Sequence, residues 1–416
     1  MKRLALTKDG KITWCTATEA SIGKGRCNHV CHQSDNQTNE EFLDSLKSSG
    51  VTDIEVNADA SSNCDNLVEK IQQTKFYSSE ASVPTVECKN GCLSIDKPFG
   101  LKDAPGVQLK GSIIIEEIDE NGNKTSKFKY LKIDELNPSK GLDYTARKHD
   151  YLYPSVSEDI CSKLIKSSDI GLNSVCYELH TIDMNGKKCT GTISDNFVEK
   201  GYYEKVLTSP NNPACIVDHN LFVEKVIDSD DKEQILESLI SFYKKSSGED
   251  IDDNSHDEFY KEFIIRQAAF DLMTGNEDRK ENSTNFVYLR NAQGNIKPIN
   301  LDYGRCIQSF WSQTMEDKKP SDELIQELAD EEAEASLRKG GVFAPGIGGS
   351  LKESVDFLLD NGFKPFEINK QELYTNLDNF SNSLKGTNLE YYAKFKVALF
   401  KSMLNNDEIR RLWKEV

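Results

Sequence analysis

The sequence lacks the features that would place it in a membrane or on nucleic acid. No apolar run approaches the roughly 18 residues of a membrane span, and the opening MKRLALTKDGK has too few apolar residues for a secretory signal. Positive charge is scarce, because 51 Lys and Arg stand against 69 Asp and Glu, giving a net charge of −18. That balance opposes nonspecific binding to nucleic acid or anionic lipid. We therefore expect a cytoplasmic protein that binds neither a membrane nor nucleic acid directly.

The cysteines do not indicate a disulfide framework. There are 11 of them, an odd number, in a chain of 416 residues that is long enough to bury a substantial core. Two pairs share one spacing, and two histidines lie beside the first pair, so zinc could be bound. Free cysteine is also an ordinary small buried residue, and both interpretations stay open. The candidate zinc ligands are Cys27, His29, Cys31, His32, Cys88 and Cys92.

The chain length and the hydrophobic periodicity predict three parts. Residues 1–91 contain short strand-like runs and one acidic helical stretch, which indicate a small α+β appendage of unknown role. Strand signals dominate residues 92–197, and helical periodicity dominates residues 198–416. We find no internal repeat and no long low-complexity tract.

The middle part has a specific predicted order of elements. The runs GSIIIEEID and KFKYLKID flank Asn121-Gly122, which predicts a β-hairpin. The segment SVSEDICSKLIKSSDIG has apolar residues at helical spacing, and SVCYELHTID and KCTGTISDNF after it are strand-like. The predicted order is therefore strand, strand, helix, strand, strand.

Two capping boxes mark helix starts in the third part. Ser255 to Glu258 precedes the apolar-periodic FYKEFIIRQAAFDLMTG, which ends at Gly275. Ser350 to Glu353 gives the same signal before VDFLLDNG, and LEYYAKFKVALFKSMLNNDEIRRLWKEV predicts a closing helix or pair of helices.

The most informative stretch follows the helix that ends at Gly275. It reads as a polar loop, a hairpin (VYLRNAQGNIKPI) and an acidic turn, Asn300-Leu-Asp-Tyr-Gly304. Phosphoryl transfer needs a carboxylate to position the acceptor hydroxyl, and an Asn and a second Asp to hold Mg²⁺. In this interpretation Asp278 orients or deprotonates the acceptor, Asn285 holds one Mg²⁺, and Asp302 holds the Mg²⁺ that bridges the phosphates. Each motif alone also fits a solvated turn, but their order directly after an apolar helix favours phosphoryl transfer.

At these residues the chain resembles the HipA-like and CtkA-like serine/threonine protein kinases, whose catalytic loop reads approximately Asn-x-Asp-Arg-His-x-x-Asn-Phe. The matching residues are Asn276, Asp278 and Arg279, closing with Asn285 and Phe286. The resemblance covers residues 100–310 approximately and leaves the first ninety or so unexplained.

The resemblance implies nucleotide-binding residues upstream. The element containing Gly106, Val107, Gln108 and Lys110 is similar to the family's phosphate-covering loop, and Lys132 stands where the family has its nucleotide-binding lysine. Glu158 would pair with that lysine to orient the α- and β-phosphates. The two later strands would lead into a hinge from Ile193 to residue 197, whose backbone would contact adenine.

The resemblance implies an α+β, bilobal kinase-like fold with a mainly β N-lobe and a helical C-lobe. The implied activity is ATP- and Mg²⁺-dependent transfer of the γ-phosphate to a Ser or Thr hydroxyl of a protein substrate. A regulatory partner that restrains the kinase is also implied. The sequence does not identify that partner or the substrate. It also does not indicate a toxin or effector context or the oligomeric state.

Three features differ from the family pattern. Lys280 replaces the usual His, and the interval from Asp278 to Asn285 is two residues longer, so Asn282 is an alternative metal ligand. Asp103 stands where the family can carry a self-phosphorylated serine.

Several residues also have a purely structural interpretation. Lys129 and Lys132 lie on opposite faces of a strand, so only one can point into a cleft, and we favour Lys132. Glu158 could be a favourable acid in the first helical turn. Arg279 could pair with an acid within the catalytic loop or be a surface charge, and Gly106 needs no function to occupy a turn.

Two other functions remain as alternatives. A lipid or small-molecule kinase would share the Asp-Arg loop, although the acidic net charge disfavours a membrane-facing patch. A pseudokinase or nucleotide-binding interaction module would bind ATP without turnover, and Lys280 and the longer loop keep this alternative open.

Overall fold

The computed structural model describes most of the second half of the chain and separate segments of the first half. The described residues are 3–7, 11–15, 29–33, 41–42, 45–46, 55–56, 85–89, 92–95, 108–118, 124–136, 153–184, 186–195, 231–247, 253–281, 287–290, 296–309, 311, 313–346 and 349–416.

The chain divides into two compact units, and the first is the smaller. It comprises residues 1–82, 200–222 and 288–296. Its described strands form a four-stranded sheet in the order β3-β1-β2-β4. The strands are β1 (Arg3–Thr7), β2 (Lys11–Cys15), β3 (His29–His32) and β4 (Glu55–Val56).

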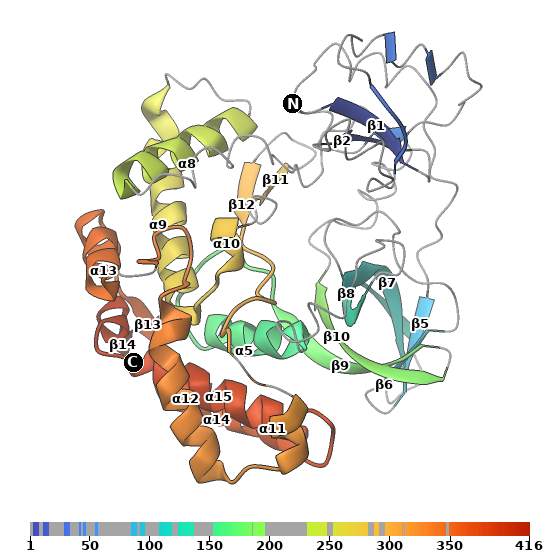
Figure 1. The fold of residues 1–416 in the computed structure, drawn as a ribbon, viewed down its shortest axis with the longest axis vertical. Helices are drawn as coiled ribbons and strands as arrows, with labels where there is room; N and C mark the ends of the chain where they lie inside the picture. The colour runs from blue at the N-terminus through green and yellow to red at the C-terminus, as the bar shows by residue number, and fades with distance from the viewer. Residues whose placement is uncertain are drawn as a thin grey trace. The chain divides into compact units, whose positions relative to one another are not determined.

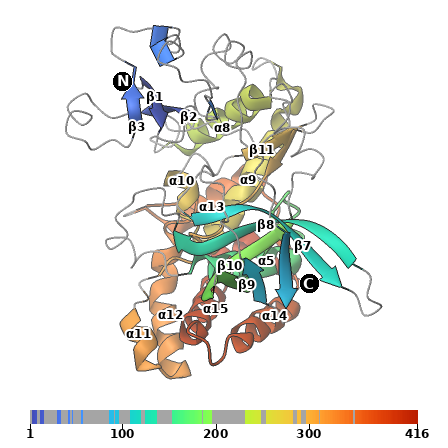
Figure 2. The ribbon, with the colours of Figure 1, turned by 90° about the vertical axis from the view of Figure 1, so that its right-hand side faces the viewer.

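The second unit contains a closed six-stranded barrel in the order β10-β8-β7-β5-β6-β9 (Figures 1 and 2). Strand β5 ends before the boundary predicted at residue 91, yet it pairs with β7. The three-part division of the chain otherwise stays a prediction. The barrel strands are β5 (Thr85–Lys89), β6 (Cys92–Ile95), β7 (Gln108–Ile118), β8 (Lys124–Leu136), β9 (Tyr177–Met184) and β10 (Lys187–Asp195).

The barrel encloses an aliphatic core. Alternate residues of each strand point inward, because successive side chains of a strand face opposite sides. The predicted hairpin is confirmed, since β7 and β8 pair in antiparallel register. The interior residues are Val86, Leu93, Ile95, Ile113, Ile115, Leu131, Ile133, Ile182 and Ile193.

Helix α5 (Pro154–Lys166) packs against the outer face of the barrel. It begins with Pro154 at the first helical position, where the missing N–H removes no intrahelical bond. It contacts β8, β9 and β10 on one side and helices α14 and α15 on the other, and Figure 1 shows it between the barrel and these helices. The predicted order strand, strand, helix, strand, strand is therefore confirmed.

The other described elements of the chain are mainly helices. Strands β11 and β12 form a separate two-stranded sheet, and β13 and β14 pair in parallel. The elements are α8 (Lys232–Ser247), η2 (Asn254–His256), α9 (Asp257–Thr274), α10 (Asp278–Glu281), β11 (Val287–Arg290), β12 (Ile296–Ile299), α11 (Gln313–Lys318), α12 (Asp322–Leu337), α13 (Leu351–Asp360), β13 (Phe366–Ile368), α14 (Lys370–Ser383), α15 (Glu390–Leu404), η4 (Ile409–Leu412) and β14 (Trp413–Glu415).

The helix ends confirm part of the capping predictions. Helix α9 ends at Gly275, whose left-handed backbone (φ 60°) favours glycine. The capping box at Ser255 is wrong, because Ser255 lies inside η2 and its N–H donates to the side chain of Asp253. Ser350 is the N-cap of α13, but its side chain makes no capping hydrogen bond.

A mixture of strands and helices is confirmed as the fold class, while the arrangement in two lobes stays a prediction. Among the helices of the described segments, none combines the length and the apolar character that a membrane span requires.

Candidate active site

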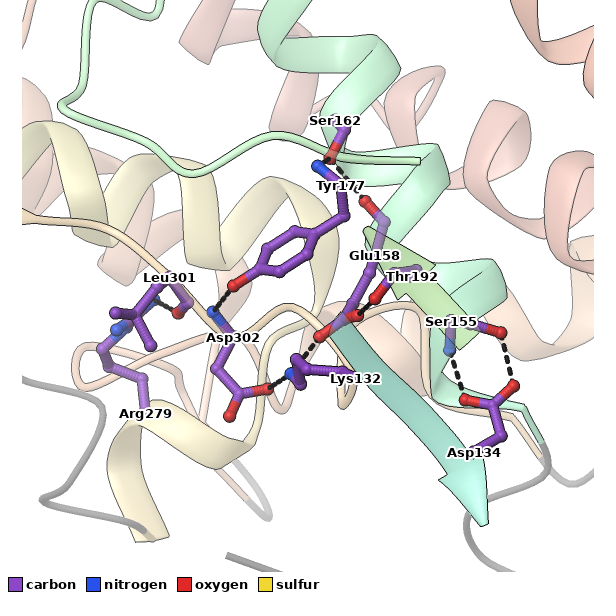
Figure 3. Close-up of polar contacts among 10 residues, drawn as sticks. All are labelled: Lys132, Asp134, Ser155, Glu158, Ser162, Tyr177, Thr192, Arg279, Leu301 and Asp302. Carbon is purple, nitrogen blue, oxygen red and sulfur yellow. Dashed lines mark hydrogen bonds and ion pairs between the residues drawn. The ribbon is translucent and has the colours of Figure 1, made fainter. Parts of the chain in front are cut away.

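A buried lysine bridges two carboxylates on the outer face of the barrel (Figure 3). The Nζ of Lys132 lies 2.9 Å from Oδ1 of Asp302, and it also forms an ion pair with Oε1 of Glu158. The side chains of Lys132 and Glu158 are 4% and 0% exposed, whereas that of Asp302 is 24% exposed. We call these three residues the lysine cluster. The ion pair between Lys132 and Glu158 that the sequence predicted is present.

Strand alternation explains why Lys132 reaches this place. Its neighbours Leu131 and Ile133 point into the barrel core, so Lys132 points outward toward α5. Lys129 instead pairs with Asp195, which is exposed, so the lysine that we favoured is the one in the cluster. Thr192 of β10 stands directly opposite Lys132 in the strand register.

A side chain of β10 holds the carboxylate of Glu158 in place. The hydroxyl of Thr192 donates to its second carboxylate oxygen, Oε2. Because α5 begins at Pro154, Glu158 lies beyond the first helical turn, and its interpretation as an acid of that turn is wrong.

Asp134 anchors the start of α5. Its carboxylate accepts a hydrogen bond from the N–H of Ser155 (3.1 Å) and others from the hydroxyls of Ser155 and Thr190 (2.6 Å for Thr190). Burial raises the pKa of Asp134 to about 6. These contacts join β8, α5 and β10 and so hold the helix that carries Glu158, and Figure 3 shows the contact between Asp134 and Ser155.

Asp302 has a left-handed backbone (φ 63°), which is uncommon for a residue other than glycine. Its N–H donates to the hydroxyl of Tyr177 (3.3 Å), and the ring of Tyr177 lies 5.3 Å from Nζ of Lys132. At Gly304 a Cβ would come within 3.0 Å of Pro154 and 3.8 Å of Glu158, so the turn packs closely against the start of α5.

A second lysine lies near Asp302. Lys110 of β7 is paired with Lys132 in the strand register, and directly paired residues lie on the same face of a sheet. Burial raises the pKa of the Asp302 carboxyl, but the charges of Lys132 and Lys110 outweigh that effect and lower it to about 2. Asp302 is therefore ionised at neutral pH.

The two carboxylates of the lysine cluster differ in proton affinity. Burial raises the pKa of Glu158, and the charge of Asp302 adds to that rise while Lys132 opposes it. Burial lowers the pKa of Lys132, but Asp302 and Glu158 raise it well above its ordinary value. The cluster thus keeps a charged ammonium beside a partly exposed, ionised carboxylate.

A second buried ion pair lies below the loop that follows α9. The Nε of Arg279 lies 2.8 Å from Oδ2 of Asp271, and the two side chains are 0% and 1% exposed. Its Nη2 donates to the side chain of Asn300 (2.6 Å) and to the carbonyl of Leu301 (3.4 Å). We call Asp271, Arg279 and Asn300 the arginine cluster. Of the two interpretations of Arg279, the pairing with an acid is correct.

The arginine cluster also fixes the backbone at Asp278. The side chain of Asn276 donates to Asp271 (2.9 Å) and accepts from the N–H of Asp278 (3.2 Å). The N–H of Gly341 donates to the carbonyl of Asn276 (2.8 Å). Asp278, counted as a whole residue, is 8% exposed, and it is the first residue of α10.

Arg305 contacts both acidic residues at this loop. Its Nη1 lies 2.9 Å from Oδ1 of Asp278, and its Nη2 lies 2.5 Å from Oε1 of Glu277. Arg305 directly follows the Asp302-Tyr303-Gly304 turn, so the same short segment reaches the lysine cluster and Asp278.

The end of that segment is held by the C-terminal helices. Ile307 has φ 56°, an unfavourable conformation for a β-branched residue. Its N–H donates to the carbonyl of Thr274 (2.7 Å), and the ammonium of Lys396 in α15 donates to its carbonyl. Burial lowers the pKa of Lys396 to about 7. The hydroxyl of Ser336 donates to the carbonyl of Gln308, so α12 holds the segment as well.

Other predicted site residues fall partly outside the described segments. Gly106, Val107, Asn282 and Asn285 lie outside them, as does the end of the predicted hinge, so their roles stay predictions. Gln108 is the first residue of β7. The side chain of Ile193 packs in the barrel core, and the predicted contact of its backbone with adenine stays a prediction.

Five polar residues of the site were not singled out from the sequence. Only Asp271 carried a local signal, because it is an acid within an otherwise apolar helix stretch. The others depend on pairing between distant segments. These residues are Tyr177, Thr192, Asp271, Asn300 and Arg305.

The zinc hypothesis also stays open. Cys88 is exposed on β5 and Cys92 is half-buried on β6, and both are free thiols. Within the described segments, no group of three or more His, Cys, Asp or Glu residues is placed to hold a metal ion. Cys27 lies outside those segments.

No family model and no curated protein matches this chain. Among solved structures, it is similar to the proinflammatory kinase CtkA of Helicobacter pylori, with 13% sequence identity and a TM-score of 0.41. The similarity covers 78% of this chain and 99% of CtkA. A similarity of this size says nothing about activity, so the function has to be argued from the geometry.

Proposed function

We propose that this protein is a serine/threonine protein kinase that transfers the γ-phosphate of ATP to a protein hydroxyl in the presence of Mg²⁺. The observation that carries the proposal is the buried Lys132 between Glu158 and Asp302. A lysine held by one acid, beside a second ionised acid, is the arrangement with which protein kinases bind the phosphates and the metal of ATP.

The donor set near Asp302 suits a nucleotide with a hard cation. The carboxylate of Asp302 is ionised and partly exposed, and Mg²⁺ prefers such oxygen ligands. Lys132 and Lys110 supply positive charge on the same face of the sheet, where they would bind phosphate oxygens. Asn285 or Asn282 would complete the metal site. Bound Mg²⁺ would neutralise charge that develops on the phosphates.

The loop after α9 would act on the acceptor. Asp278 would accept a hydrogen bond from the Ser or Thr hydroxyl, orient its oxygen toward the γ-phosphate and take up its proton. Arg279 lies fully buried in the arginine cluster and would support this loop rather than contact the substrate. Glu158, held by Thr192, would keep Lys132 in place.

Incubation of the purified protein with γ-labelled ATP and Mg²⁺, alone and with cell lysate, tests the proposal. We expect label on the protein itself or on a lysate protein, at Ser or Thr in phosphoamino acid analysis. Asp302→Asn should abolish labelling, and Asp278→Asn should slow it by about 100- to 10,000-fold. Asp378→Asn is the matched control, because Asp378 forms an exposed ion pair with Lys401 elsewhere on the helical part.

The other outcomes separate the alternatives. Stabilisation by ATP on heating without any transfer would indicate a pseudokinase or a nucleotide-binding module. Label in an organic extract instead of on protein would indicate a lipid kinase. Absence of ATP binding, or labelling that both site variants retain, would overturn the proposal.

A further inference from the structure

Arg305 binds the candidate base through a two-pronged contact. One guanidinium nitrogen contacts Asp278 at 2.9 Å and the other contacts Glu277 at 2.5 Å. All three side chains are mostly buried, with 22% of Arg305, 12% of Asp278 and 16% of Glu277 exposed. A planar guanidinium presents donors in a fixed fork and so defines the relative position of two carboxylates more closely than an ammonium does.

Arg305 joins Asp278 to a carboxylate that a second cation also contacts. The second oxygen of Glu277, Oε2, lies 3.5 Å from Nζ of Lys339. The guanidinium that contacts Asp278 is therefore linked through Glu277 to Lys339 as well.

Arg305 is also rigidly connected to Asp302. The N–H of Cys306 donates to the carbonyl of Tyr303 (3.0 Å), which closes a tight turn around Gly304 and Arg305. The side chain of Gln308 donates to the carbonyl of Arg305 (3.1 Å). The position of the guanidinium is thus tied to the position of Asp302, three residues earlier.

We propose that Arg305 is a positioning residue that holds Asp278 at a fixed place relative to Asp302. This inference rests on the proposed function, because Asp278 and Asp302 then belong to the acceptor side and the phosphate side of one reaction. Arg305 sets the acceptor oxygen in line with the phosphate and contacts neither substrate. A displacement of about 1 Å between reacting groups can reduce a rate about 100-fold.

The proposal predicts a specific kinetic pattern for Arg305→Met. We expect kcat for phosphate transfer, to the labelled acceptor or to the protein itself, to fall about 100-fold. The KM for ATP should stay within about twofold, because the phosphate-binding lysines are unchanged. Arg305→Lys keeps the positive charge but lacks the forked guanidinium, and its kcat should be about tenfold higher than that of Arg305→Met.

A control variant and a double variant separate positioning from general stability. Arg411 also bridges two carboxylates, Asp356 and Glu408, away from the site, so Arg411→Met should leave kcat unchanged. Arg305→Met should add little to the loss that Asp278→Asn causes alone, since it acts through Asp278. Melting temperatures of all variants show whether each one is folded.

Failure of this inference and failure of the proposed function give different results. If the parent transfers phosphate and Arg305→Met matches Arg411→Met, or raises KM for ATP with kcat unchanged, Arg305 does not position the base. If Arg305→Met is unfolded, Arg305→Lys decides, because a folded lysine variant with full kcat contradicts the need for the fork. A parent that transfers no phosphate overturns the proposed function, and this inference with it.

Discussion

The lysine cluster and the arginine cluster are both buried ion pairs, but they differ in access to solvent. In the arginine cluster both charged side chains are at most 1% exposed, and Arg279 is bonded to Asp271, Asn300 and a backbone carbonyl. In the lysine cluster one cation serves two acids, and Asp302 is 24% exposed. A cluster with no solvent-exposed charge can only stabilise the fold, whereas a cluster with an exposed charge can also bind a ligand. Under the proposed function, Arg279 in the arginine cluster would support the fold, and Lys132 in the lysine cluster would bind the nucleotide.

Removal of Arg279 should have the largest effect on stability. Arg279→Met leaves the carboxylate of Asp271 buried without its cation, and we expect the free energy of unfolding to fall by about 3–5 kcal/mol. Chemical denaturation followed by circular dichroism measures this change. Arg411→Met is the control and should cost less than about 1 kcal/mol, because its ion pairs are partly exposed. Equal losses of unfolding free energy in the two variants would contradict a supporting role for the arginine cluster.

Removal of Lys132 should abolish ligand binding, and it should also lower stability because the buried Glu158 loses its cation. Saturating ATP and Mg²⁺, at 100 times the dissociation constant, should stabilise the parent by about 2.7 kcal/mol. We expect Lys132→Met to lose that stabilisation, since the phosphates lose their main cation. Lys129→Met is the matched control from the opposite face of β8 and should keep it. If ATP still raises the melting temperature of Lys132→Met, nucleotide binding at the lysine cluster is ruled out.

Gly191 of β10 tests whether the spacing between β8 and β10 sets the position of Lys132 in the lysine cluster. A Cβ on Gly191 would lie 2.3 Å from the carbonyl oxygen of Lys132, so Gly191→Ala must push β8 and β10 apart. We expect a loss of about 1–3 kcal/mol and weaker ATP binding. Gly186→Ala, whose Cβ would meet no atom within 4 Å, should cost about 1 kcal/mol for its left-handed backbone and leave ATP binding intact. Identical ATP binding in both variants would show that the strand spacing does not set the position of Lys132.

Asp134 should make the stability of the protein depend on pH. Its pKa is about 6 in the folded protein and 3.8 ordinarily, so the folded state binds the proton more tightly. The free energy of unfolding should therefore fall as the pH rises from about 4 to about 6, by up to about 3 kcal/mol. Asp134→Asn should flatten this slope. Denaturation at several pH values measures it, and a variant with an unchanged slope would exclude Asp134 as its source.

The sequence predicted those parts of the site that depend on local pattern. Lys132 lies between two apolar strand residues, and period-two alternation places it outside the core. Gly275 ends its helix for reasons that are visible in the sequence. The contact of Thr192 with Glu158 could not be predicted, because it depends on the register between β8 and β10. The contact of Arg305 with Asp278 depends on the path of a turn, which periodicity does not specify.

The error at Ser255 has a local physical cause. In a capping box the side chain of Glu258 would accept a hydrogen bond from the N–H of Ser255. The side chain of Asp253 accepts that hydrogen bond instead. A short 3₁₀ turn then replaces the predicted capping box. Such competition between neighbouring polar side chains decides helix starts by small energy differences that a pattern does not rank.

The bond from Lys396 to Ile307 has a consequence for the order in which the protein assembles during synthesis. Lys396 follows Ile307 by 89 residues, so a ribosome adding 5–20 residues per second needs roughly 5–20 seconds between them. Until α15 emerges, Ile307 has no ammonium to hold its unfavourable backbone conformation. A nascent chain can therefore form the barrel, α5 and the lysine cluster before α15 emerges, and the segment that ends at Ile307 receives this contact only when α15 docks.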